Sequence, residues 1–294
     1  MKAEISVVLG SYNRNKFLKL TIESIRSEMM SSKLPFEIIV VDGGSDDGTL
    51  PWLMKQKDII AIVQHNHGKW RGQKVEKKTW GYFMNLGFKA ARGKYLCMLS
   101  DDCLVVPGAI KNGYDLFEEK IKLNEKVGAI AFYWRNWPEH EKYWVNLTLG
   151  NMMFVNHGLY LTEALKNVDY IDEETYAFYH ADGDLCLKMW QKGYTIIDSP
   201  NSFIEHYSHA NMKQRKQNST RQKTDWNNYL DKWDGIFYSR NEAKEGKGIS
   251  KEYNDQFCVA KKFKRVIGAE LSRIAHKIIK YGLNVILGVR KESH

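Results

Sequence analysis

Short apolar runs and helix-spaced apolar positions alternate along the first hundred residues. Four runs have the length and β-branched character of buried strands: Ile5–Leu9, Phe36–Val41, Ile59–Val63 and Tyr95–Leu99. Apolar side chains recur at three- and four-residue spacing over residues 17–25 and around Phe83–Ala91, which indicates helices. This strand–helix–strand rhythm predicts an α/β fold, with a mostly parallel, Rossmann-like sheet and flanking helices.

Polar turns follow three of the predicted strands. They are Gly10–Arg14, Asp42–Thr49 and Ser100–Asp102, and all three are rich in glycine or in polar and acidic side chains. Ligands of such sheets gather outside the carboxyl ends of the strands, so the sequence predicts one polar cleft there.

The composition narrows the class of protein. Hydrophobic residues make up 43% of the 294 residues and aromatic residues 13%, which is enough for a large buried core. No apolar run approaches the roughly 18–20 residues that span a bilayer, and the first strand begins too early for a cleaved signal peptide. We therefore expect a cytoplasmic protein rather than a membrane-spanning, secreted or fibrous one.

The four cysteines, at positions 97, 103, 186 and 258, form no C-x-x-C pair. Their spacing is that of reduced thiols in a cytosolic protein, and it argues against a disulfide framework or a structural zinc site.

The positive charge is confined to the end of the chain. Residues 1–200 hold 25 basic and 25 acidic side chains, whereas residues 201–294 hold 19 and 10, so the net charge of +9 belongs to the last third. From Val259 onward apolar residues recur every three or four positions between lysines and arginines, which predicts basic amphipathic helices. We divide the chain into a domain over 1–210 and a basic, mainly helical extension over 211–294.

Two roles are open for this extension. Residues 259–290 could lie on an anionic membrane surface, where each cation contributes on the order of 1 kcal/mol, at the inner face of the plasma membrane. They could instead dock on the body of the protein or on a second subunit of a homo-oligomer. Liposome sedimentation with and without residues 259–294 distinguishes these roles. Nucleic acid is a poor partner, because the charge excess is local and no recognised module is visible.

Two acidic turns are candidates for ligand binding. Asp101 and Asp102 adjoin a buried strand, where paired carboxylates suit a divalent cation such as Mn²⁺ or Mg²⁺; the alternative is a helix cap or a solvated turn. Asp42 begins a Gly/Asp turn in which the backbone could approach a ligand and the carboxylate could bind a ribose or a base; the alternative is a structural turn.

The second half of the chain holds further candidates. Asp182 and Asp184 begin a predicted helix, where one of them could act as a general base or both could merely favour the helix dipole. His206 could bind a metal or serve as a structural histidine. The aromatic stretch 131–144 contains Trp134, Trp137 and Trp144, which could stack on sugar rings or pack in the core.

The order and spacing of five segments are more specific than any single one. They are SVVLGSYNR (6–14), EIIVVDGGSDDGT (37–49), NLGFKAARGKYLCMLSDD (85–102), HADGDLCLKMWQKGY (180–194) and DSPNSFIEH (198–206). Together they resemble the inverting nucleotide-sugar glycosyltransferases of family 2, which have the GT-A fold, over about residues 4–210. The resemblance implies a metal-dependent enzyme that transfers a sugar from a nucleotide diphosphate, UDP being favoured, to a hydroxyl with inversion.

The resemblance also implies roles for individual residues. The family's general base falls on Asp182, and its metal ligands fall on Asp102 and His206. Its nucleotide-binding positions fall on Ser11, Tyr12, Arg14, Asp42, Asn85, Ser100 and Asp101. We assign acceptor binding to Trp134 and Trp137.

This chain departs from the family's pattern at several positions. Gly43 stands where many members have a second acid, Ser100 replaces the first acid of the D-x-D motif, and Ala181 replaces a glutamate beside the base. Residues 66–84 form a longer connection than usual, so Lys69, Trp70 and Arg71 belong to an atypical loop or lid.

The expected acceptor is a saccharide, with a lipid-linked one in bacterial surface-polysaccharide assembly favoured.

Two other classes of protein stay open. A sugar nucleotidyltransferase would release pyrophosphate and usually carries a Gly-rich basic loop near its N-terminus, which is not evident here. A non-catalytic carbohydrate-binding module would not need Asp102 or Asp182.

Overall fold

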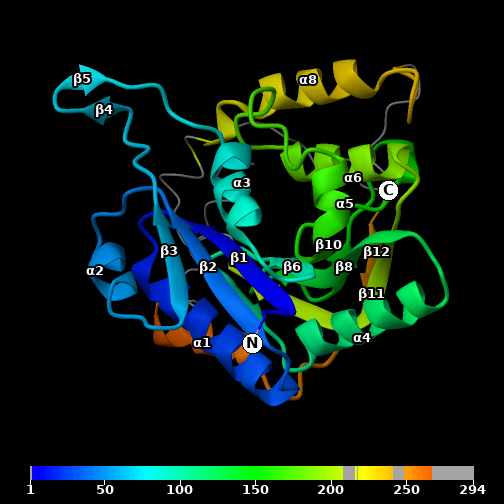
Figure 1. Ribbon diagram of the computed structural model, residues 1–294, viewed down its shortest axis with the longest axis horizontal. Helices are drawn as coiled ribbons and strands as arrows, with labels where there is room; N and C mark the ends of the chain where they lie inside the picture. The colour runs from blue at the N-terminus through cyan, green and yellow to red at the C-terminus, as the bar shows by residue number, and fades with distance from the viewer. Residues whose placement is uncertain (1, 208–215, 217, 241–247, 267–294) are drawn as a thin grey trace, which may run out of the picture.

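A computed structural model describes residues 2–207, 216, 218–240 and 248–266 (Figure 1). Four parallel strands form one half of its main sheet, in the order β3-β2-β1-β6. They are β1 (Ile5–Ser11), β2 (Phe36–Asp42), β3 (Ile59–Val63) and β6 (Tyr95–Met98). The four strands predicted from the apolar runs are thus confirmed, and so is the α/β fold class.

The other half of the sheet is mixed and could not be read from the apolar pattern. β10 (Gly158–Leu161) runs antiparallel between β6 and β8 (Val127–Asn136), and β9 (Tyr143–Val145) and β12 (Ile249–Lys251) extend that edge. β11 (Thr195–His206) pairs parallel with β8 and antiparallel with β7 (Cys103–Val105), so the sheet curls. This curl brings His206, at the end of β11, opposite Cys103.

Helices cover both faces of the sheet (Figure 1). α1 (Asn15–Ser32) and α4 (Ala109–Lys122) pack on one face, with α2 (Thr49–Leu53) at its edge. α3 (Trp80–Ala90), α5 (Thr162–Asn167) and α6 (Ala181–Gln191) pack on the other. Alternate residues of β1 feed the two cores, since Val7 points to the α1 side and Val8 to the α3 side.

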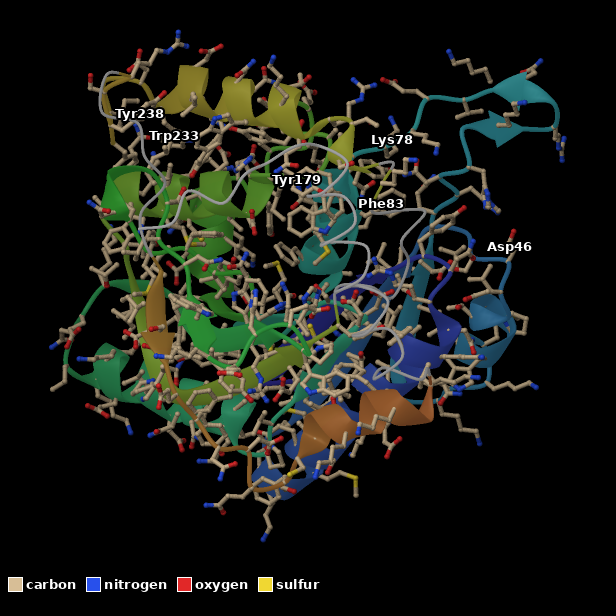
Figure 2. All side chains as sticks on the ribbon, turned by 180° about the vertical axis from the view of Figure 1, so that it is seen from behind. Asp46, Lys78, Phe83, Tyr179, Trp233 and Tyr238 are labelled. Atoms are coloured by element: carbon tan, nitrogen blue, oxygen red, sulfur yellow. The ribbon has the colours of Figure 1, made fainter. Side chains whose placement is uncertain are left out.

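Two further elements lie outside these layers. α8 (Gln222–Trp233) covers α6, and Figure 2 places Trp233 at its end, on the other side of the molecule from Asp46, which follows β2. The short strands β4 (Lys69–Trp70) and β5 (Gln73–Lys74) form a hairpin that extends away from the sheet (Figure 1). The atypical segment 66–84 is therefore a projecting hairpin followed by the start of α3.

The first turn of the predicted basic tail is a 3-10 helix, η2 (Val259–Arg265), and it docks on the body. Phe263 is fully buried and its ring lies 5.4–6.2 Å from those of Phe17, Trp137 and Tyr207. The rest of the predicted amphipathic tail, from residue 267, lies outside the described residues. Among the described residues, no helix combines the length and apolar character needed to cross a membrane.

Candidate functional site

The polar turns predicted to face a common cleft come together where β1, β2 and the β6–β7 turn end. Ser11 and Asp42 are register partners at the ends of β1 and β2. The turn after β6 is held from α1, because the Thr21 hydroxyl donates to the carbonyls of Asp101 (3.0 Å) and Cys103 (2.7 Å). The Tyr207 amide donates to the Asp102 carbonyl at 2.9 Å, which ties the end of β11 to the same turn.

Asp42 is fully buried and organises the turn after β2. Its Oδ1 accepts hydrogen bonds from the amides of Gly44 and Ser45, and its Oδ2 accepts one from the Ser45 hydroxyl. A Cβ at Gly43 would lie 3.0 Å from Cδ2 of Tyr12. The tyrosine ring therefore lies against the position where many family members have a second acid, which gives a steric reason for Gly43.

Arg14 spans the two carboxylates of the acidic turn. Its Nη1 donates to Asp101 Oδ1 at 2.7 Å and to Asp102 Oδ2 at 2.8 Å, and both carboxylates are only 3% exposed. The sequence placed Arg14 near the nucleotide base, whereas the structure joins it to Asp101 and Asp102. This guanidinium partly compensates for the buried carboxylates, whose charges would be costly without a partner.

The two carboxyls respond differently to this environment. Burial raises the pKa of Asp101 to about 6, because its loss of water and the charge of Asp102 outweigh Arg14. Burial also opposes ionisation of Asp102, but Arg14 and His206 hold its pKa below the usual range. Asp102 is therefore ionised at neutral pH.

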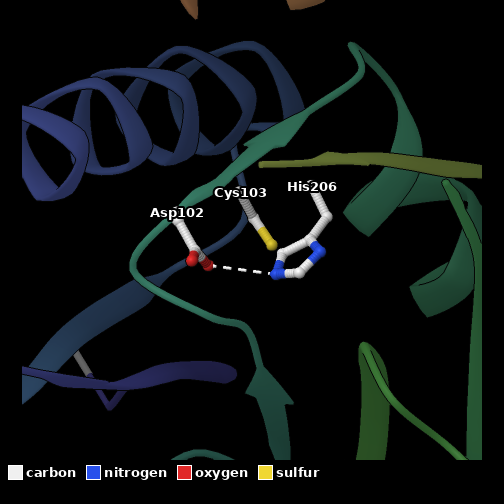
Figure 3. A group of neighbouring side chains, drawn as sticks. All are labelled: Asp102, Cys103 and His206. Atoms are coloured by element: carbon white, nitrogen blue, oxygen red, sulfur yellow. Dashed lines mark ion pairs between the residues drawn. The ribbon is translucent and has the colours of Figure 1, made fainter. Parts of the chain in front are cut away.

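Asp102, Cys103 and His206 form a compact group of donors (Figure 3). Asp102 Oδ1 lies 3.3 Å from His206 Nε2, is buried, and accepts no hydrogen bond from the described residues. His206 Nδ1 lies 2.6 Å from Asn136 Oδ1, which can only accept, so Nδ1 carries a proton and Nε2 faces Asp102. A buried carboxylate oxygen that accepts no hydrogen bond, next to an imidazole nitrogen, suits a divalent cation.

Asp182 and Asp184 occupy the same helix, α6, but have different surroundings. Asp184 is fully buried and accepts from Tyr176 Oη (3.0 Å) and Trp233 Nε1 (2.9 Å). It also pairs with Lys232, which binds Asp172 in turn. Asp184 thus fastens α8 to α6, and only Asp182 remains as a candidate base.

Asn156, which the sequence analysis missed, links Asp182 to the aromatic wall. Its Nδ2 donates to Asp182 Oδ2 at 3.2 Å, while its Oδ1 accepts from Trp134 Nε1 (3.1 Å) and Asn146 Nδ2 (2.9 Å). The Trp134 ring meets that of His206 edge-on, with the centroids 5.7 Å apart. Contacts therefore run without interruption from the candidate cation site through Trp134 and Asn156 to Asp182.

The protonation of Asp182 is balanced between two effects. Burial raises the pKa of its carboxyl, while hydrogen bonds from the Gly183 amide and from Asn156 favour the charged form and partly offset the rise. A carboxylate with a raised pKa is a stronger base than an ordinary aspartate, which suits removal of a proton from a hydroxyl.

An open cleft of about 640 Å³ lies beside this group. Trp134 and Trp144 form its aromatic walls, and its polar lining is made by Glu139, His140, Glu141, Lys142 and Asn146. Trp137 does not line it; its ring packs on Phe263, with the centroids 5.8 Å apart. Trp134 thus lines the cleft and Trp137 does not, and the acceptor roles of both stay predictions.

Asn85 and Ser100 are two further residues that were predicted to bind a nucleotide. Asn85 is buried on α3, and its amide group makes three hydrogen bonds to Ile171 and Glu173. Ser100 is partly buried at the end of β6, next to the acidic turn. Their roles toward a nucleotide stay predictions.

The model of glycosyl transferase family 2 matches residues 6–171, and the chain belongs to this family. It is 26% identical over 107 residues to a chondroitin synthase of Pasteurella multocida, covering 35% of this chain and 10% of that protein. It is 30% identical over 122 residues to glycosyltransferase GlyG of Streptococcus pneumoniae, covering 41% of this chain and 37% of that one. These matches span well under half of the relatives' length.

Solved structures share the fold. S. aureus TarS 1–349 matches with a TM-score of 0.52 and 20% identity, covering 71% of this chain and 61% of that one. The mannosyltransferase PcManGT of Pyrobaculum calidifontis, solved with GDP-Man and Mn²⁺, matches with a TM-score of 0.52 and 16% identity, covering 84% and 66%. The predicted GT-A fold is thereby confirmed.

Proposed function

We propose that this chain is a cation-dependent inverting glycosyltransferase, with Asp102 and His206 as cation ligands and Asp182 as the general base. The observation that carries the proposal is the unbroken contact path from the Asp102–His206 pair through Trp134 and Asn156 to Asp182. This path connects the candidate cation site with Asp182, whose pKa is raised. Displacement at an anomeric carbon needs both a positive charge near the leaving group and a base near the attacking hydroxyl.

The chemistry divides between the two ends of this path. Asp102 and His206 would hold a divalent cation, whose positive charge would stabilise the departing nucleotide diphosphate. Asp182 takes the proton of the acceptor hydroxyl, and Asn156 holds its Oδ2 in place. Arg14 keeps Asp101 and Asp102 together, and Asp42 shapes the turn that faces the nucleotide. Attack from the opposite face of the sugar inverts the anomeric centre without a covalent intermediate.

We assign the donor as a nucleotide-diphosphate sugar, with UDP favoured. TarS has been solved with UDP-GlcNAc, with a TM-score of 0.50 to this chain, and PcManGT with GDP-Man, so both nucleotides need testing. In calorimetric titrations of UDP, GDP and dTDP with and without Mn²⁺, we expect one nucleotide to bind in a Mn²⁺-dependent manner.

Asp102→Ala serves as the variant in these titrations, and we expect it to weaken Mn²⁺-dependent binding at least tenfold, because it removes the unpartnered Oδ1. Asp115→Ala, at an exposed site on α4, is the matched control and should bind like the parent protein. Equal binding by Asp102→Ala and the parent would refute the cation site.

The acceptor in our proposal is a saccharide that lies along the Trp134–Trp144 cleft. An aromatic face contributes about 0.5–1.5 kcal/mol beyond its buried area. Trp144→Ala is therefore expected to raise the acceptor KM about three- to tenfold with little change in kcat or in nucleotide affinity. Trp52→Ala on α2, outside the cleft, is the control. An unchanged KM would exclude this cleft as the acceptor site.

A lipid-linked acceptor, a role in surface-polysaccharide assembly, and a cytoplasmic location with peripheral membrane contact remain parts of the proposal. Since η2 is docked through Phe263, the truncation in the sedimentation experiment should begin at residue 267. A sugar nucleotidyltransferase is the second candidate, and release of pyrophosphate instead of nucleoside diphosphate would identify it.

A further inference from the structure

A cysteine lies among the candidate cation ligands. Cys103 Sγ, one ligand atom of Asp102 and one of His206 all lie within 4.8 Å of one another. Figure 3 shows the thiol and the imidazole converging on the same side of the Asp102 carboxylate. Some point in space therefore lies within about 2.8 Å of all three atoms. Metal–ligand bonds of about 2.0–2.3 Å need only a small contraction of this group.

Neighbouring residues position these three donors. Asp102 directs Oδ2 to Arg14, while its Oδ1 accepts no hydrogen bond and faces His206 Nε2 at 3.3 Å. Asn136 fixes the His206 ring through its Nδ1. Cys103 Sγ lies 3.6 Å from Nε2 of buried His157, a contact that holds the sulfur in place. A second residue thus holds each of the three donors in place, as is usual for the ligands of a metal site.

The donor set favours a softer ion than oxygen ligands alone would. Carboxylates and water suit Mg²⁺ and Mn²⁺, whereas a thiolate with an imidazole selects Zn²⁺ and chemically similar ions such as Co²⁺. Cys103 is buried, so its sulfur is accessible only to a ligand that enters this group of donors.

We infer that Cys103 is a third metal ligand, and that the site of Asp102 and His206 binds Zn²⁺ and Co²⁺ through a sulfur atom. Binding releases the thiol proton and leaves a thiolate on the ion. The inference rests on the cation site of the proposed function but concerns a different property, the selectivity of that site. A thiophilic ion would then compete with Mn²⁺ for the same place.

The test is a Co²⁺ titration of the full chain followed by absorption spectroscopy. Cys258, the exposed cysteine, is first replaced in a Cys258→Ser background so that it cannot bind the ion itself. We expect a thiolate-to-cobalt charge-transfer band that saturates near one equivalent and disappears when Zn²⁺ is added. Cys103→Ser should abolish the band and weaken Zn²⁺ binding at least tenfold, whereas Cys97→Ser, at another buried cysteine, should leave both unchanged.

The outcomes separate the two proposals. Co²⁺ binding without the band, lost in Asp102→Ala, would overturn the role of Cys103 and leave the cation site intact. A band that persists in Cys103→Ser would also overturn it. If Co²⁺ does not bind while UDP still binds with Mn²⁺, the inference fails and the proposed function stands. Circular dichroism of Cys103→Ser and Cys103→Ala checks that either variant is folded.

Discussion

Asp182→Ala is expected to lower kcat by two to four orders of magnitude and to leave the nucleotide affinity and Tm nearly unchanged. Removal of a general base costs a factor of this size. The fold loses little, because burial already raises the pKa of Asp182 and so disfavours its charged form. Rates with saturating donor and acceptor, calorimetric nucleotide binding and thermal unfolding measure the three quantities. A kcat within tenfold of the parent would exclude Asp182 as the base.

Asn156→Ala is the companion variant, because it changes the base without removing it. The amide of Asn156 favours the ionised form of Asp182, so its loss raises the pKa of that carboxyl further. Transfer needs the ionised form and declines as the pH falls through this pKa. The acid limb of the pH–kcat profile should therefore move to higher pH in Asn156→Ala. A merely structural role for Asn156 would lower Tm without moving the limb.

Asp184→Ala, two residues further along the same helix, is expected to produce the opposite result, a loss of stability. Three donors, Tyr176 Oη, Lys232 Nζ and Trp233 Nε1, lose a fully buried acceptor. Hydrogen bonds to charged groups contribute about 1.5–3 kcal/mol each, and Lys232 keeps Asp172 as a partner, so we expect a net cost of about 3–4 kcal/mol.

That cost corresponds to a fall in Tm of roughly 6–12 °C for a chain of this size. Chemical denaturation and thermal unfolding measure it, and the kcat of the folded fraction should stay within a few-fold of the parent, which separates this effect from that of Asp182→Ala. Since α8 is held to α6 by the same contacts, proteolysis within residues 218–240 should also accelerate. A Tm equal to that of the parent would mean that Asp184 does not fasten α8.

The apolar pattern was sufficient for the parallel half of the sheet. β1, β2 and β6 are buried on both faces, so each is a continuous apolar run in the sequence; the edge strand β3 is only partly buried but is apolar throughout. The strands β7, β9 and β12 have three residues each, and their pairing depends on contacts between distant segments. A run of three residues carries no period, so their place in the sheet could not be predicted.

The candidate site was predictable where a residue type implied its chemistry. Asp42, Asp102, Asp182 and His206 were found because carboxylates and an imidazole follow strands or begin a helix. Asn156 lies in a loop before β10, without a pattern around it, and its role depends on three partners that are distant in sequence. The parts played by Arg14 and Cys103 likewise depend on the curl of the sheet and on side-chain direction, which no local pattern encodes.

The guanidinium that spans Asp101 and Asp102 has a consequence for how the enzyme matures. Because Arg14 pairs with both carboxylates from within the chain, the body can fold before any ion arrives. Under the proposed cation dependence, chain folding and metal loading are separate events, and a shortage of metal would leave a folded, inactive pool instead of degraded protein. Such a pool could be activated by the supply of metal alone, without new synthesis.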